Sequence, residues 1–168
     1  MPAAQTYEPI ATTTLGSATN SITFSSISQS FTDLVLVCTG TANTASSFDI
    51  QVGNGSVDTG ANYSITLLAG DGSSASTYRE SNTPACQQMG IVYTTPMNST
   101  IHFMNYCNES GSTYKGLLSR NNNLGFRGVA TTAGLWRNTS AINIIKISTG
   151  GANMATGFTA TLYGIKAA

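Results

Sequence analysis

Apolar residues are most concentrated between Leu34 and Cys38, where five consecutive positions are apolar. Successive side chains of a β-strand point to opposite faces. One face of this strand therefore carries Leu34, Leu36 and Cys38, the other carries Val35 and Val37, and both faces are apolar. This pattern predicts a central strand over residues 33–39 that is covered on both faces. The outer face of a lone sandwich is ordinarily wet, so Val35 and Val37 are candidate contacts for a covering loop or for another subunit.

Elsewhere apolar and polar positions alternate, which is typical of strands with one wet face. Phe48, Ile50 and Val52 show this period of two clearly. No segment has the period of a helix. Counted together, the alternating and apolar stretches give about ten strand candidates: residues 10–15, 22–25, 33–39, 48–52, 62–69, 89–93, 101–106, 114–119, 141–148 and 158–163.

The segments between these candidates have turn or loop chemistry. Gly53-Asn-Gly-Ser56 and Gly70-Asp-Gly-Ser-Ser74 are predicted turns, because Gly and Asn accept the backbone angles of tight turns. Residues 75–85 are polar and irregular and are predicted to form a long loop. Residues 121–125 and 128–134 are also predicted to be loops. Residues 1–9 lack any period and contain two prolines, so they are expected to form an N-terminal arm before a single domain over 10–168.

Composition favours the same fold class. Ser, Thr and Asn together supply 59 of the 168 residues, whereas charged residues make up only 8%. Thr favours strands, and Asn, Ser and Gly favour turns, so the mixture predicts many short strands joined by tight loops. The expected fold is an all-β antiparallel sandwich, jelly-roll-like, with about 8–10 strands. The chain is long enough to build a core without disulfides or metals.

The cysteines and the charges indicate the cellular compartment and the kind of surface to expect. Cys38, Cys86 and Cys107 are odd in number and lack metal-ligand spacing, so we interpret them as reduced packing residues, which fits assembly in a reducing cytoplasm. One disulfide with a free thiol is the alternative. No apolar run reaches transmembrane length, and no signal peptide is recognisable. Residues 1–109 carry a charge of minus six and residues 110–168 of plus six, which either marks a basic surface or reflects two halves that interleave in the fold.

Catalytic chemistry has little support in this sequence. The only histidine, His102, is flanked by Phe103 and Met104 in a predicted strand, where a histidine is usually structural. The seven acids are scattered mainly in turns, without the facing pair that a glycosidase needs. Clustered Cys or His ligands for zinc and grouped acids for calcium are also absent from the sequence. We therefore expect no enzyme activity, no metal and no cofactor.

The best candidate for a recognition surface is the segment 114–137, in which basic and aromatic residues are interleaved. Arg and aromatic residues are enriched where protein interfaces bind tightly. Plain fold stabilisation is the main alternative, and nucleic acid is disfavoured because the chain has no net positive charge. With the outward valines, the candidate interface residues are Val35, Val37, Tyr114, Arg120, Arg127, Trp136 and Arg137.

Five stretches occur in a characteristic order: 22–27 (ITFSSI), 31–37 (FTDLVLV), 62–64 (NYS) followed by 67–73 (LLAGDGS), 136–147 from Trp136 through Ala141-Ile142 to Ile147, and 161–165 (TLYGI). Together they resemble a family of tailed-bacteriophage virion structural proteins. The resemblance covers most of the chain, from about residue 7 to 165. It implies a single β-sandwich domain, and the family offers no catalytic residues to carry over.

The resemblance leads to an expected function. The first expectation is a capsid decoration, or cement, protein on the exterior of the virion head, where a homotrimer bridges capsomers and binds the major capsid protein. The alternative is a tail-fibre or baseplate domain that binds host-surface glycans, with Tyr114 or Trp136 stacking on sugar rings. An enzyme on a β scaffold is a third class with the least support. Neither main alternative involves nucleic acid or a membrane.

Overall fold

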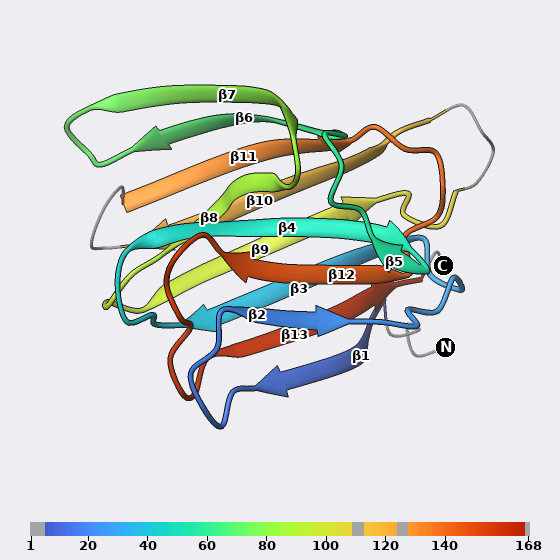
Figure 1. Cartoon of the computed structure of the whole chain (residues 1–168), viewed down its shortest axis with the longest axis horizontal. Coiled ribbons are helices and arrows are strands. Elements are labelled where there is room, and N and C mark those ends of the chain that lie inside the picture. Colours follow the sequence, from blue (N-terminus) through green and yellow to red (C-terminus); the bar gives the residue numbers. More distant parts are fainter. Residues whose placement is uncertain (1–5, 109–112, 124–127, 167–168) are drawn as a thin grey trace.

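Two antiparallel β-sheets pack face to face to form the protein (Figure 1). The structure is a computed structural model, and it describes residues 6–108, 113–123 and 128–166. These residues contain thirteen strands, and no helix is found among them. The predicted all-β antiparallel sandwich is therefore confirmed, with more strands than the ten that the sequence pattern indicated.

The larger sheet has eight strands and the smaller has five. In spatial order the larger sheet consists of β1 (Tyr7–Thr14), β13 (Thr159–Ile165), β3 (Asp33–Gly40), β9 (Met97–Met104), β10 (Lys115–Asn123), β11 (Gly128–Trp136), β6 (Tyr63–Gly70) and β7 (Ala75–Thr83). The smaller sheet consists of β2 (Ser21–Phe24), β12 (Ile144–Thr149), β4 (Ser46–Asn54), the short β5 (Ser56–Val57) and β8 (Cys86–Val92), which also pairs with β4.

The strand order contains a jelly roll. One four-stranded group runs β1-β13-β3-β9, and the facing group runs β2-β12-β4-β8. Strands from the two ends of the chain alternate within each group, as in the double-sheet jelly-roll arrangement. This topology supports the jelly-roll form of the prediction. It also favours the interleaving of the two oppositely charged parts of the sequence, because strands of the acidic part and strands of the basic part are neighbours in both sheets.

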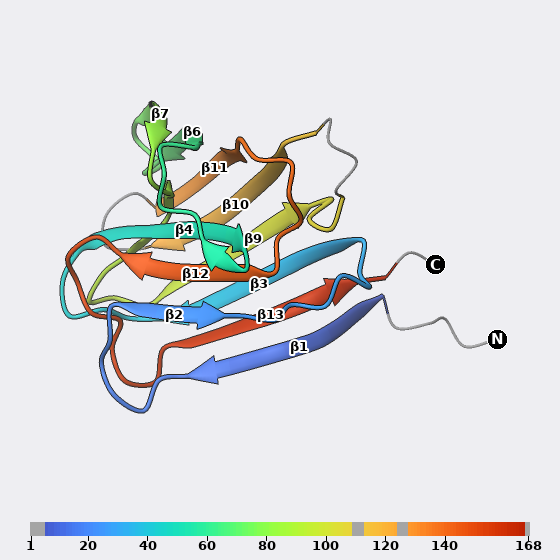
Figure 2. The same cartoon turned by 45° about the vertical axis from the view of Figure 1, so that its right-hand side comes forward.

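Two hairpins lengthen the larger sheet beyond the jelly roll. The β6–β7 hairpin is inserted between β4 and β8, and the β10–β11 hairpin between β9 and β12. They join as β10-β11-β6-β7 at the free side of β9, and we call these four strands the extension. In Figure 2 the extension rises past the edge of the smaller sheet, so much of it forms a single layer.

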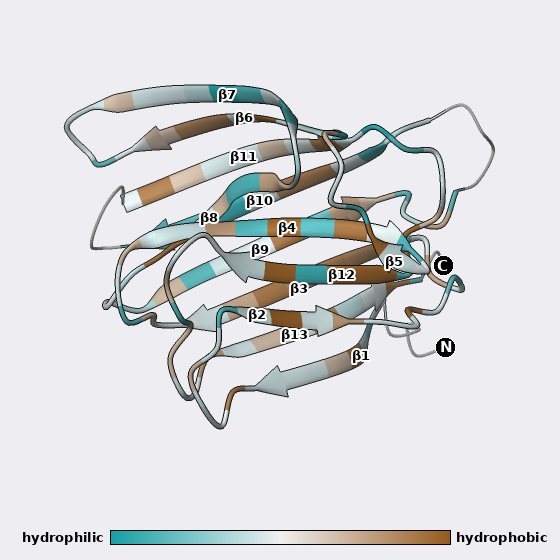
Figure 3. Cartoon of the chain, in the orientation of Figure 1, coloured by the Kyte–Doolittle hydropathy of each residue, from teal (hydrophilic) through white to brown (hydrophobic). Residues whose placement is uncertain are grey.

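The core lies between the sheets and follows the alternation of the sequence. Leu34, Leu36 and Cys38 of β3 are fully buried, and so are Phe48, Ile50 and Val52 of β4. Figure 3 shows the corresponding alternate hydrophobic and hydrophilic bands along β4 and β12. At one end of the core the rings of Phe48 and Phe158 pack with their centroids 6.3 Å apart. A small separate apolar cluster, formed by Leu67, Ala69 and Ala130, lies in the extension.

Four predictions of local structure were wrong. Residues 75–83 form β7 and residues 128–136 form β11, although both were predicted to be loops, and β10 continues to Asn123. The expected arm also ends earlier, because β1 begins at Tyr7 and pairs with β13. These segments are polar or rich in small residues, so their strand conformation depends on ladder hydrogen bonds to neighbours rather than on an apolar period.

Strand β8 joins the extension to the smaller sheet through side chains. Ser99 Oγ donates to the carbonyl of Met89 at 3.1 Å, Asn123 Nδ2 to Ile91 at 2.8 Å and Thr132 Oγ1 to Gln88 at 2.7 Å. All three donors are buried on the inner face of the larger sheet. They satisfy carbonyl groups of β8 that would otherwise be buried without partners. This seam fixes the position of the extension relative to the jelly roll.

The three cysteines are free thiols in this fold. Cys38 and Cys86 are buried and Cys107 is half-buried. Burial raises the pKa of both buried thiols, that of Cys86 to about 12, so both stay protonated and act as packing groups. The structure thus agrees with the interpretation of reduced packing cysteines.

Candidate functional site

The outer face of the larger sheet carries most of the large apolar side chains that the described residues expose. The smaller sheet packs on the opposite, inner face. The exposed fractions are 54% for Leu68, 40% for Met104, 40% for Leu118 and 63% for Val129. Side chains scattered singly over a surface are ordinary, but these lie on adjacent strands of one sheet face. We call this surface, made by the outward residues of the eight-stranded sheet, the outer face.

Cross-strand register shows how the outer face is built. Directly paired residues share a face, and one row runs across five strands from Val37 through Thr100, Arg120 and Thr131 to Leu68. The neighbouring row runs from Val35 through His102 and Leu118. Hydroxyl and apolar side chains therefore alternate with only a few charges along the face.

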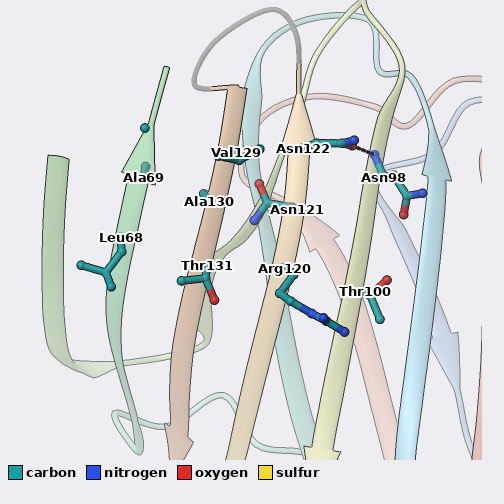
Figure 4. Close-up of a pocket in the computed structure, with 11 residues that line it drawn as sticks. Leu68, Ala69, Asn98, Thr100, Arg120, Asn121, Asn122, Val129, Ala130 and Thr131 are labelled. Carbon is teal, nitrogen blue, oxygen red and sulfur yellow. Dashed lines mark hydrogen bonds between the residues drawn. The ribbon is translucent and has the colours of Figure 1, made fainter. Parts of the chain in front are cut away.

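A shallow depression of about 620 Å³ lies on the outer face over the extension and β9. Figure 4 shows Leu68 and Thr131 on one side of it and Thr100 on the other, with Arg120 between them. Near the end of β9 the backbone N–H of Asn98 donates to Asn122 Oδ1 at 3.1 Å, which holds that side chain in place. The lining residues with outward side chains are Leu68, Asn98, Thr100, Arg120, Asn122, Val129 and Thr131.

Among the described residues that line the depression, Arg120 is the only charged one. Its guanidinium has no hydrogen-bond or ion-pair partner in residues 6–108, 113–123 and 128–166. Elsewhere on the face, His102 Nε2 lies 3.1 Å from Asp33 Oδ2. Asp33 also accepts the backbone N–H of Asn105 at 2.6 Å. Within the described residues, no acidic side chain therefore pairs with the guanidinium of Arg120.

The two predicted outward valines do lie on this face, but they differ in exposure. Val37 is half-buried, whereas Val35 is only 7% exposed. Val35 is flanked across the sheet by Tyr163 and His102, which pair with it on both sides. Neighbours within the chain therefore shield Val35, and its burial requires no other subunit.

The other predicted interface residues lie elsewhere. Tyr114 is 55% exposed just before β10, and Arg127 lies outside the described residues. Arg137 is half-buried, and its guanidinium donates to the carbonyl of Ala61 and to Asn82 Oδ1, both at 2.7 Å. Arg120 is thus the one member of the basic group that the structure places on the outer face.

Trp136 is a core residue, which corrects its prediction as a surface contact. Its side chain is 1% exposed, and its indole N–H donates to Asp58 Oδ2 at 2.8 Å. No face of the ring is open to a partner or to a sugar. Burial acts to raise the pKa of Asp58, but hydrogen bonds from Trp136, Asn62 and Gly60 together lower it. This hydrogen-bond network stabilises the loop after β5, so we assign it a structural role.

The surroundings of His102 do not form a catalytic constellation. Its partner is Asp33, and its cross-strand neighbours are Val35 and Leu118, which offer no nucleophile. In the described part of the chain no three His, Cys, Asp or Glu side chains are grouped so that they could hold a metal ion. No helix of that part is long and apolar enough to span a membrane.

Sequence reasoning missed Leu68, Leu118, Val129 and Met104 as members of the site. A local signal existed for two of them. Leu67-Leu68 and Leu117-Leu118 are pairs of adjacent apolar residues in strands with one wet face, so one leucine of each pair must point outward. For Val129 no signal existed, because its strand was predicted to be a loop.

Comparison with protein-family models, with curated proteins and with solved structures finds no match to this chain. What is established is therefore the fold, a β-sandwich with jelly-roll topology and a four-stranded extension. The role of the outer face has to be argued from its own chemistry.

Proposed function

We propose that the protein is a non-enzymatic structural protein of a tailed-phage virion that adheres to other proteins through the outer face. The observation that carries this proposal is the set of exposed apolar side chains, Leu68, Met104, Leu118 and Val129, on one sheet face. Apolar patches of this kind on a soluble protein mark interaction sites. In this role the protein contributes buried contact area rather than chemistry.

The outer face has a suitable size. From the strand spacing and the rise per residue, eight strands of about eight residues present roughly 34 Å by 26 Å, or ~900 Å². A stable protein–protein interface buries about 800 Å² on each partner. Docking of this one face would therefore bury enough area for a specific complex.

The more specific role that we propose is capsid decoration. Jelly rolls recur in viral capsid proteins and in lectins, which supports this role by analogy only. The resemblance of five sequence stretches to phage virion proteins favours the same role. A homotrimer on the exterior of the head would contact the major capsid protein at several sites at once, and its release would require all contacts to break together.

Localisation in purified virions tests the proposal. Virions that contain this chain are imaged by electron microscopy with a specific antibody, and proteins released by mild stripping are quantified. We expect labelling over the head and a high copy number. A few copies confined to the tail would contradict capsid decoration.

Sizing of the recombinant protein tests the oligomer separately. Analytical ultracentrifugation at high concentration should give a trimer. A strict monomer would contradict the trimer but not the adhesive role of the outer face.

A tail-fibre or baseplate domain that binds host-surface glycans is the second candidate. The depression favours it, because about 620 Å³ lies within the usual size range of small-molecule sites and the lining carries amide, hydroxyl and guanidinium groups. The described lining residues include no aromatic ring, and Trp136 is buried. Binding of any glycan would therefore rest on hydrogen bonds and on Arg120.

A further inference from the structure

Arg120 constrains the chemistry of whatever covers the outer face. It lies on the central strand of the depression, and apolar Leu68 and Val129 lie on the two strands beyond. A partner that buries those apolar side chains must also cover at least part of the guanidinium. The argument below therefore rests on the proposed function of this face.

Covering Arg120 without an anion would be unfavourable. A buried charge that lacks a partner loses its hydration without compensation, whereas a carboxylate can accept two parallel hydrogen bonds from a guanidinium. Among the residues that the structure describes, no acid pairs with Arg120. Asp33, on β3 of the same sheet, already bonds to His102 and Asn105. The anion has to come from the partner.

The groups around Arg120 leave it available. Figure 4 shows its side chain reaching from β10 across β9 toward Thr100, along the surface rather than away from it. Thr100 and Thr131 flank it in the same cross-strand row. They offer small hydroxyl groups that neither compete for the guanidinium nor block its approach.

We infer that the partner of the outer face is a protein surface with an Asp or Glu carboxylate that pairs with Arg120, surrounded by apolar groups that cover Leu68 and Val129. A protein fits better than a saccharide, because the depression is continuous with the wider apolar face that includes Leu118 and Met104. Few other charges take part, so this single pair fixes the register of docking.

Rebinding to stripped virion heads tests the inference. Heads from which this protein has been removed are titrated with the recombinant wild type and with Arg120→Gln, Arg120→Lys and Arg120→Glu. Lys146→Gln is the control, because Lys146 is half-buried on β12 of the smaller sheet and lies away from the outer face. Each variant is checked by thermal unfolding, and Arg120 variants should fold normally since the side chain is exposed and unpaired.

We expect Arg120→Gln to weaken binding by about 30-fold or more, Arg120→Glu to weaken it further, and Arg120→Lys to recover part of the affinity. Lys146→Gln should bind within about twofold of the wild type, as a charge outside the contact does. The salt dependence of binding should also fall in Arg120→Gln, because the one screenable pair is gone.

Three results would overturn the inference, each in a different way. Equal binding of the wild type and Arg120→Gln to heads refutes the carboxylate but leaves the proposed function intact. A wild type that does not bind heads at all refutes both. If instead the wild type binds glucuronate-containing oligosaccharides on a glycan array and Arg120→Gln does not, the partner is an acidic saccharide and not a protein.

Discussion

The jelly roll and the extension share the larger sheet, but their strands are buried to different extents. In the jelly roll, β3 and β9 are covered by the smaller sheet, and residues such as Leu36 and Phe103 are fully buried. In the extension, β7 is exposed over most of its length and has only one neighbouring strand. The jelly roll thus gains its stability from a two-layer core. The extension shares this core through residues such as Tyr63, Leu117 and Trp136, but its outermost strand β7 depends on ladder hydrogen bonds to β6.

Because of this difference, the residues that stabilise the fold and the residues that we propose for binding lie mostly in different regions. Core residues of the jelly roll cannot change without cost, but the outward residues of the extension can. The depression and Arg120 lie mainly on the extension. The outward side chains of the extension contribute little to folding, so they can be chosen for contact with a partner. The jelly roll holds the strands that carry them in place.

The largest expected effect is in the jelly-roll core. Phe158→Ala removes a ring that is 1% exposed and packs on Phe48. We expect a loss of about 3–5 kcal/mol in the free energy of unfolding, because the cavity cannot collapse fully. Urea denaturation followed by circular dichroism measures it. Tyr114→Ala, which changes an aromatic residue that is 55% exposed, is the control and should change stability by less than about 0.5 kcal/mol.

The next effect is at the seam between β11 and β8. A methyl group at Gly134 would lie 2.8 Å from Cys86 Sγ and 3.4 Å from Leu117 Cβ. Gly134→Ala should therefore cost about 1–3 kcal/mol through overpacking. Gly116→Ala is the matched control, since its methyl group would meet only the flexible end of Met104 at 3.1 Å. Equal stabilities of the two variants would show that the seam is looser than the structure indicates.

A smaller effect is expected at the loop after β5. Trp136→Phe removes the hydrogen bond to Asp58 and should cost about 1–2 kcal/mol at neutral pH. The pKa of Asp58 is lowered in the folded protein, so its contribution is present above the ordinary value near 3.8 and is lost as pH falls through the folded pKa.

The stability difference between the wild type and Trp136→Phe should therefore shrink in acid. Denaturation at a series of pH values between about 7 and 2 measures it. Asp58→Asn serves as the control, and with it the pH-dependent part of the difference should disappear. A difference that stays constant to low pH would mean that ionised Asp58 contributes nothing through Trp136.

The smallest change in stability is expected on the outer face. Leu118→Ser and Val129→Ser alter side chains that are 40% and 63% exposed, so unfolding should change by no more than about 0.5 kcal/mol. Binding to stripped heads should nevertheless fall for both variants, because each removes apolar area from the proposed contact. Unchanged binding with unchanged stability would exclude this face as the contact surface.

The sequence alone determined the fold class and much of the core. Alternation at Phe48, Ile50 and Val52 and the apolar run that begins at Leu34 located two central strands, because a period of two is written locally in the chain. The same local rule could have shown that Leu68 and Leu118 point outward.

Only the tertiary structure decided that β7 and β11 are strands, that Trp136 is buried and that Arg120 lines the depression on the outer face. A polar strand is held by hydrogen bonds from neighbours that are distant in sequence, so its own residues carry little sign of it. Burial of a single aromatic residue likewise depends on which loop covers it, here the loop that contains Asp58. Local periodicity records which side of a strand avoids water, but the pairing of distant strands determines which faces remain open.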